Sequence, residues 1–177
     1  MVVRVACNCS IAALAMGASA RAEPAVVLDT HDPTSVFVVA KNQNRNQVHY
    51  GVHLDPACNV VGAQPVYGYW RMLERNGEVE PILPREIPAY GVSRTQRIET
   101  RGETTTIQVR LNAAPDRPFV ITVRRVAGRC QADARMAIAG ADTRLRWVYV
   151  RFGFFGVDYI LLHGSRVSDG ASIEERL

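Results

Sequence analysis

Residues 130–138 constrain the fold of this chain more than any other stretch. They read Cys-Gln-Ala-Asp-Ala-Arg-Met-Ala-Ile, so small or apolar residues occupy every second position and polar residues fall between most of them. Side chains of a β-strand point alternately to its two faces, whereas those of a helix repeat about every 3.6 residues. The alternation therefore predicts a strand with one buried and one solvated face, and neighbouring segments that repeat the pattern are its expected partners.

Strand-like segments of similar length follow one another along the chain, separated by Gly, Pro, Asn or Asp. The expected strands are 36–40, 48–54, 66–73, 92–100, 104–112, 119–126, 130–138, 143–152 and 157–167. Short, evenly spaced strands of this kind indicate an all-β protein. We expect an antiparallel meander of eight or nine strands that closes into a small calycin-like barrel, because closure removes exposed edges. A two-sheet β-sandwich is the alternative.

The expected interior combines large and small side chains from adjacent strands. Leu145, Trp147 and Tyr149 occupy alternate positions, and Ala132 and Ala134 do so on the preceding strand. Large side chains packed against small ones interdigitate without leaving voids. The pattern therefore predicts that these five residues point inward.

Turn residues divide the first half of the chain. Asn76-Gly77 lies between strand-like runs, and Asn-Gly is a strong hairpin signal. Pro81, Pro84 and Pro88 follow closely, and proline cannot donate a hydrogen bond to a sheet. We expect at most one short helix here, over residues 84–89.

The first 22 residues have the pattern of a secretory signal peptide. Arg4 precedes an apolar stretch, and Ala20-Arg21-Ala22 places small residues at a cleavage site before Glu23. An uncleaved anchor is the alternative, but the apolar run is shorter than the roughly 20 residues that a spanning helix needs. We expect residues 23–177 to form a single domain that is periplasmic or secreted and does not span the membrane.

The charge balance excludes an obvious polyanion-binding surface. Removal of Arg4 and Arg21 with the signal lowers the formal net charge from +4 to +2, and Lys41 is the only lysine. So small an excess of cations gives no basis for nucleic-acid binding.

Two cysteines remain after the signal. Cys58 and Cys130 are able to pair in an oxidising compartment, and a bridge would close a long loop and so constrain the unfolded chain. The alternative is that Cys130 is a small buried residue of its strand. We favour the disulfide.

The familiar catalytic and metal-binding motifs are missing from the sequence. It has no Gly-rich phosphate loop, no Gly-x-Ser-x-Gly elbow and no Cys-x-x-Cys pair. Residues 153–156, Gly-Phe-Phe-Gly, read as a turn. His49 and His53 lie on an expected strand, where a separation of four residues is about 13 Å and too far for one metal ion. The sequence thus assigns no catalytic residue, metal or cofactor.

Amides and aromatic residues gather in the first half of the chain and form the only candidate binding site. Its members are Asn44, Asn46, Tyr50, Trp70, Glu86 and Tyr90. Amides beside aromatic rings are able to hold a polar ligand with an apolar face, such as a sugar or a peptide. In the alternative interpretation, the asparagines cap a turn and the aromatic rings pack the sheet.

The same region carries a resemblance to a known family. The matching residues are Asn44-x-Asn46-x-Val48-x-Tyr50, Pro65-Val66 leading to Tyr69-Trp70, Leu83 and Glu86 before Ala89-Tyr90-Gly91, and Asp158-Tyr159-Ile160 through Gly164, Gly170 and Glu174. In order and spacing they resemble the bacterial domain-of-unknown-function family 4833. The resemblance implies an exported single-domain protein and no particular activity. Cys58 and Cys130 are not part of this pattern.

Three functions remain open. The first is a non-catalytic envelope protein that binds a small-molecule, glycan or protein ligand and has an open, partly polar cavity. The second is a structural or interaction module with a filled core and an apolar surface patch. The third is a hydrolase, which requires two ionisable groups that converge in a cleft. We favour the first.

Overall fold

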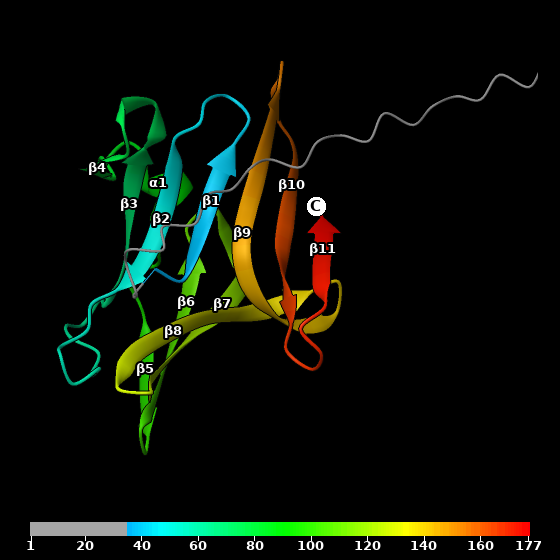
Figure 1. Ribbon diagram of the computed structural model, residues 1–177. Coiled ribbons are helices and arrows are strands. Elements are labelled where there is room, and N and C mark those ends of the chain that lie inside the picture. The colour runs from blue at the N-terminus through cyan, green and yellow to red at the C-terminus, as the bar shows by residue number, and fades with distance from the viewer. Residues whose placement is uncertain (1–34) are drawn as a thin grey trace, which may run out of the picture.

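The computed structural model describes residues 35–177, in which eleven strands form one hydrogen-bonded sheet (Figure 1). The strands are β1 (Phe37–Lys41), β2 (Gln47–Val52), β3 (Val66–Met72), β4 (Glu78–Pro81), β5 (Arg97–Arg101), β6 (Thr104–Leu111), β7 (Ala114–Val126), β8 (Arg129–Ile138), β9 (Ala141–Gly153), β10 (Gly156–Arg166) and β11 (Ser172–Arg176). A 3-10 turn, η1 (Leu73–Arg75), and a single turn of α-helix, α1 (Ile87–Tyr90), interrupt them. The expected signal peptide lies outside the described residues.

The sheet is built on the long strand β9. One edge of β9 pairs antiparallel with β8 through residues 141–144 and then parallel with β1 through residues 147–150. Its other edge pairs with β10, which in turn pairs with β11. The strand order is β4-β3-β2-β1-β9-β8-β7-β6-β5. We call β1–β4 the first lobe and β5–β8 the second lobe.

The predicted meander of the second half is confirmed, because every consecutive pair from β5 to β10 is antiparallel. The count of eight or nine strands was too low. β4 has four residues and ends in proline, and β11 is largely polar and exposed, so neither shows a clear apolar alternation. The predicted helix is present as one turn, shifted toward the C-terminus.

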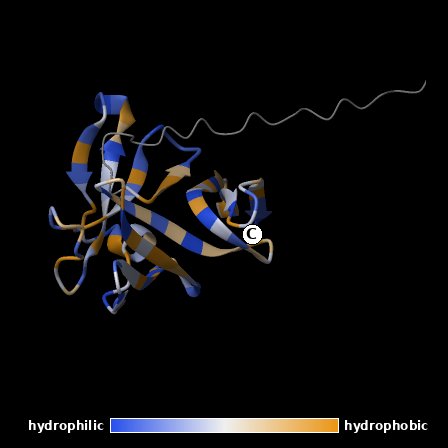
Figure 2. Cartoon of the chain, turned by 60° about the horizontal axis from the view of Figure 1, so that its bottom comes forward, coloured by the Kyte–Doolittle hydropathy of each residue, from blue (hydrophilic) through white to orange (hydrophobic). Residues whose placement is uncertain are grey.

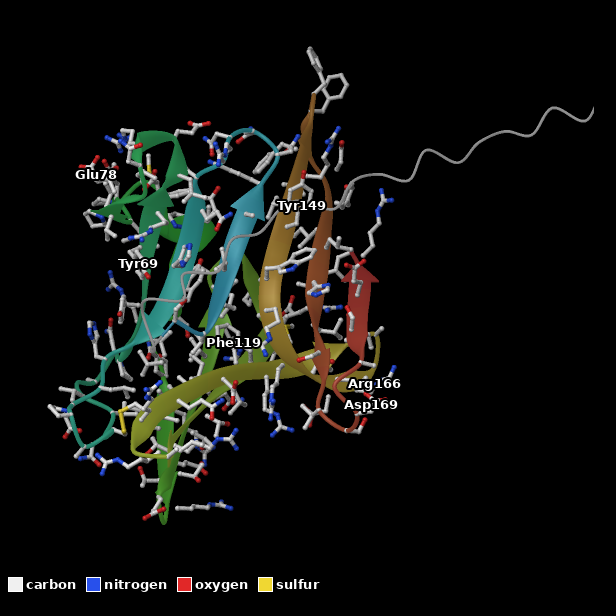
Figure 3. All side chains as sticks on the ribbon, in the orientation of Figure 1. Tyr69, Glu78, Phe119, Tyr149, Arg166 and Asp169 are labelled. Carbon is white, nitrogen blue, oxygen red and sulfur yellow. A yellow bond between two sulfur atoms is a disulfide. The ribbon has the colours of Figure 1, made fainter. Side chains whose placement is uncertain are left out.

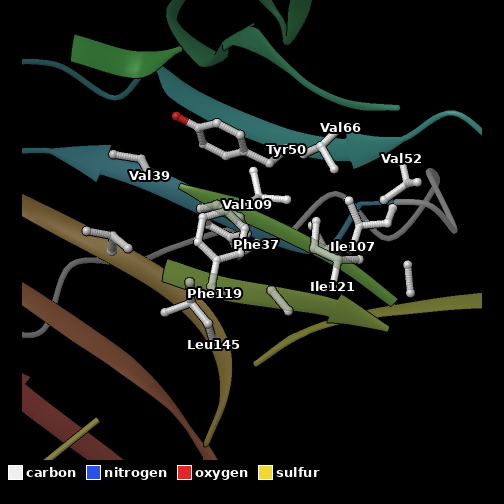
Figure 4. Close-up of a cluster of buried hydrophobic side chains, with 14 of the residues drawn as sticks. Phe37, Val39, Tyr50, Val52, Val66, Ile107, Val109, Phe119, Ile121 and Leu145 are labelled. Carbon is white, nitrogen blue, oxygen red and sulfur yellow. The ribbon is translucent and has the colours of Figure 1, made fainter. Parts of the chain in front are cut away.

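The hydrophobic core lies between the two lobes (Figure 4). Phe37 of β1 stacks on Tyr50 of β2 at 4.4 Å between ring centroids and meets Phe119 of β7 edge-on at 5.2 Å. Figure 2 shows polar and apolar residues alternating along the strands, as a sheet with one buried face requires. In β8, Ala132 and Ile138 belong to the core, which confirms the alternation in residues 130–138.

The expected closed barrel is not confirmed, because the sheet remains open. No registered backbone pair joins β4 to β5 among residues 35–177. Near this opening, the side-chain amide of Gln96 takes the place of a strand: the N–H of Val66 donates to Oε1 at 3.1 Å, and Nε2 donates to the Val66 carbonyl at 3.3 Å. These two bonds satisfy the backbone N–H and carbonyl of Val66 on the edge of β3 that no strand covers at this residue.

The predicted inward direction was wrong for Tyr149, whereas Trp147 is buried but lies outside the core between the lobes. The register between β9 and β10 shifts at this point, since His163 pairs with Trp147 whereas the next residue, Gly164, pairs with Leu145. The extra residue in β9 is Arg146, and one extra residue reverses the faces beyond it. Leu145 and Val148 therefore face the core, while Trp147 stacks on His163 with ring centroids 4.5 Å apart.

The predicted disulfide between Cys58 and Cys130 is present (Figure 3). It joins the β2–β3 loop of the first lobe to the start of β8 in the second lobe, with the two Cα atoms 5.3 Å apart. Arg125 adds a hydrogen bond from Nη2 to the carbonyl of Pro56 in the same loop, at 3.1 Å. The bridge therefore fastens the lobes to each other at one end of the core.

An ion pair between Arg117 and Glu175 attaches β11 to β7. Arg117 of β7 donates two hydrogen bonds to the carboxylate of Glu175, at 2.7 and 3.1 Å, and the N–H of Ala139 donates a third. These bonds hold the pKa of Glu175 at about 2, and those from Arg117 have the largest effect. The last strand is thus tied to the second lobe as well as to β10.

Loss of the disulfide should destabilise the protein through its unfolded state. The bridge links residues 72 positions apart, for which chain entropy predicts a loss of about 4 kcal/mol in the Cys58→Ser/Cys130→Ser variant. Urea denaturation measures the effect, and the reduced wild-type protein is the control. Equal stability of the oxidised and reduced wild-type proteins would contradict the role of the bridge.

Gln96→Glu tests the side-chain closure of the open seam. A carboxylate accepts from the N–H of Val66 but is unable to donate to its carbonyl, so we expect a loss of about 1–3 kcal/mol in the free energy of unfolding at pH 7. Gln108→Glu, at an exposed position of β6, is the matched control. Equal urea midpoints for the two variants would show that the Gln96 bonds contribute nothing.

Candidate functional site

The predicted binding residues divide between two hollows. Asn44, Asn46, Trp70 and Glu86 line an open cleft of about 260 Å³, which we call the polar cleft. Its other lining residues are Lys41, Met72, Glu80, Pro81, Leu83 and Arg85. Tyr50 and Tyr90 line a separate apolar cavity of about 100 Å³ between the lobes. The structure thus brings four of the six predicted residues together.

The two asparagines shape the turn between β1 and β2. The side-chain oxygen of Asn44 accepts from the N–H of Asn46 at 3.2 Å, and that of Asn46 accepts from the N–H of Glu74 at 3.2 Å. Asn46 is buried, and its bond links the turn to η1. The side-chain oxygens of both asparagines therefore cap backbone N–H groups, as the alternative interpretation expected. Both side chains also form part of the cleft wall.

Trp70 and Glu86 form a fixed polar contact at the cleft. The indole Nε1 of Trp70 donates to Oε2 of Glu86 at 2.9 Å, and the N–H of Leu83 donates to the same oxygen at 2.9 Å. Burial alone would raise the pKa of Glu86, but these hydrogen bonds, with Arg85 and Lys41 nearby, lower the pKa below its ordinary value. The Glu86 side chain is therefore a carboxylate anion whose position is fixed by hydrogen bonds.

Lys41, which sequence analysis did not select, supplies the cation next to this pair. Its Nζ lies 4.9 Å from the ring centroid of Trp70 and 5.9 Å from that of Tyr90, and these two rings meet edge-on at 4.9 Å. Partial burial lowers the pKa of Lys41, while Glu86 and Glu74 oppose that shift. The signal for Lys41 was its position as the only lysine, directly after an apolar strand.

Further charges line the rim of the polar cleft. Glu80 of β4 forms an ion pair with Arg75, and Arg85 lies on the segment that leads to α1. The cleft thus offers both signs of charge beside an indole ring. Such a surface is chemically suited to a polar ligand that has hydrogen-bonding groups and one apolar face. No cluster of three metal-ligating side chains occurs within residues 35–177.

Tyr50 belongs to the core. Its side chain is fully buried, and its hydroxyl donates to the carbonyl of Tyr90 at 2.8 Å, which ties β2 to the end of α1. Burial raises the pKa of Tyr50 well above its ordinary value. Tyr90 forms part of the apolar cavity and also contacts Trp70 and Lys41, so it separates the cavity from the polar cleft.

The comparison with protein families decides the relationship that the sequence suggested. The model of the family described as a domain of unknown function, DUF4833, matches residues 37–176. The chain belongs to the DUF4833 family. The matched range contains every residue of the polar cleft. No curated protein and no solved structure matches the chain. Within the described part of this DUF4833 protein, no helix has the length and apolar character to cross a bilayer.

The chemical environment of Lys41 is directly measurable, because a single lysine gives a single side-chain labelling site. Burial lowers the pKa of Lys41, so labelling by an amine-reactive reagent should reach half its maximal rate below pH 10.5, the ordinary value. Glu86→Gln removes a carboxylate that favours the cation and should lower this midpoint further. Peptide mapping separates Lys41 from the terminal amine.

Glu99→Gln, on the distant strand β5, is the matched control and should leave the midpoint unchanged. A midpoint at or above pH 10.5, or one that Glu86→Gln raises, would contradict the described placement of Lys41.

Proposed function

We propose that this DUF4833 protein is a non-catalytic envelope protein that binds a small or polymeric polar ligand, such as a glycan or peptide, in the polar cleft. The observation that carries the proposal is the Lys41–Trp70–Glu86 group. A cation lies over the indole ring, and the indole N–H is bonded to a held carboxylate. The group is pre-organised, so that a ligand would meet charges and an aromatic surface whose positions are already fixed.

Export is part of the proposal and has two supports. Residues 1–22 carry the pattern of a signal peptide, and the Cys58–Cys130 bridge is of the kind that persists in oxidising compartments. An envelope location would place the cleft among glycans and peptides.

The carboxylates of the cleft favour binding over hydrolysis. A glycosidase of the common type requires one carboxyl group that is protonated near neutral pH. Glu86 has a lowered pKa and accepts two N–H bonds, and Glu80 is paired with Arg75. The filled-core module anticipated no cavity, whereas the protein has an open cleft and an apolar cavity. The apolar surface patch that this module also anticipated is present at Phe154 and Phe155, so an interaction role remains the second candidate.

The two tryptophans of the chain allow a direct binding test. Trp147→Phe removes the one outside the cleft and leaves Trp70 as the sole fluorescent indole. We expect soluble chitin-type oligosaccharides or zwitterionic short peptides, used as probes, to change its emission in a saturable manner. A folded protein that gives no saturable response to either class of probe would contradict the proposal.

Variants of the charged residues show whether binding occurs in the cleft. Lys41→Met and Glu86→Gln should each weaken the affinity for the responding probe by about ten-fold, the effect of one charge-assisted hydrogen bond. Arg101→Gln, an exposed cation of β5, is the control and should bind as the parent does. Unchanged affinity in both cleft variants would place the binding elsewhere.

A further inference from the structure

The turn between β9 and β10 exposes two adjacent phenylalanines. Phe154 is 95% and Phe155 is 98% exposed, and their rings contact each other edge-on at 4.9 Å. Val157, the second residue after them, is 54% exposed. Figure 1 shows that the β9–β10 hairpin projects past the loop between β1 and β2. Exposed apolar side chains that cluster in this way mark an interaction surface.

Hydrogen bonds and close packing support the base of the hairpin tip. The side-chain amide of Asn42 makes two hydrogen bonds with the backbone of Phe152. Nδ2 of Asn42 donates to the Phe152 carbonyl at 2.9 Å, and the Phe152 N–H donates to Oδ1 of Asn42 at 2.7 Å. Asp158 packs over Gly153 so closely that a Cβ there would lie 2.1 Å from Oδ1. Gly156 has a positive φ of 138°, which a residue with a side chain rarely adopts.

Cationic side chains lie behind the tip. Arg151 is in register with Tyr159 of β10, and the guanidinium carbon of Arg176 lies 4.1 Å from the centre of the Tyr159 ring. At about 3.3 Å per residue, Arg151 is about 10 Å along the strand from Phe154. Asp158 is the acid in this hairpin end, and it is packed against Gly153.

This spacing matches the cross-section of a bilayer surface. Amphipathic surface-binding segments bury their apolar side chains about 5–10 Å into the boundary between headgroups and acyl chains. With Phe154 and Phe155 at that depth, Arg151 lies at the level of the headgroups, where anionic lipids attract arginine. A convex tip with two exposed rings fits a fluid surface from every direction, whereas a protein partner would need a matching pocket.

We propose that the Phe154–Phe155 tip docks the protein on the surface of a bilayer that contains anionic phospholipids, with Arg151 and Arg176 at the headgroups. The docking surface is separate from the polar cleft and goes beyond ligand binding. Both are connected to the same part of β1, since Lys41 lines the cleft and the neighbouring Asn42 supports the hairpin. Docking would therefore hold the cleft close to the membrane.

Flotation of the purified protein with lipid vesicles tests this proposal. We expect binding to phosphatidylcholine vesicles that contain phosphatidylglycerol, and weaker binding to phosphatidylcholine alone. Phe154→Ser/Phe155→Ser should lower the partition coefficient by at least about ten-fold, because two large apolar side chains are lost from the interface. Arg151→Gln should reduce binding only to the vesicles with phosphatidylglycerol.

Val126→Ser is the matched control, since Val126 is an exposed apolar residue at the β7–β8 turn and should not affect binding. Lys41→Met should also bind vesicles normally, which separates this test from that of the cleft. If the wild-type protein stays with neither kind of vesicle, or if the double Phe variant binds as the wild type does, the docking proposal is wrong. Capture of a protein instead of lipid by the intact tip would also overturn it.

Discussion

Two strands share one edge of β9, and the rest of the fold depends on this arrangement. Residues 141–144 of β9 pair with β8, and residues 147–150 pair with β1. Because a strand has only one partner per edge at any point, β8 must leave β9 where β1 begins. The single sheet is thereby divided into two lobes that face each other, and the apolar side chains of both lobes, such as Phe37 and Phe119, bury one another.

The same arrangement determines where the candidate site lies. β1 ends beside β9, so its last residue, Lys41, and Asn42 in the turn that follows adjoin both the β9–β10 hairpin and the first lobe. The segment between β4 and β5 must cross from one lobe to the other. Within this segment, Glu86 accepts a hydrogen bond from Trp70, and the Tyr90 carbonyl accepts one from Tyr50. Gln96 accepts one from the N–H of Val66. The polar cleft is therefore a consequence of an open seam that side chains cover in place of a strand.

Local patterns predicted the features that depend on local chemistry. Alternation identified β8, and Asn76-Gly77 identified a turn in which both residues have positive φ. The pairing of β1 with β9 joins residues about 110 positions apart and leaves no mark on either segment. One added residue at Arg146 reversed the faces of Trp147 and Tyr149, and a bulge of this kind follows from tertiary packing. The side-chain closure of the open seam likewise depends on Gln96, one glutamine among many polar residues.

The site shows the same division. Asn44, Asn46 and Trp70 were found because amides and aromatic residues gather near turns, whereas Tyr50 shares its face with Val48 and Val52 and faces the core as they do. Lys41 was missed because the chemical character of a lone lysine depends on neighbours that only the fold provides, namely Trp70, Tyr90 and Glu86.

The shared edge of β9 is open to a direct measurement by nuclear Overhauser effects between backbone protons in solution. The described pairing predicts contacts from residues 141–144 to β8 and, in the same sample, from Val148 to Val39 of β1 in parallel register. Contacts from Val148 to β8, which would make the β8–β9 hairpin continuous, or an absence of contacts to β1, would contradict the two-lobed fold and the cleft built on it.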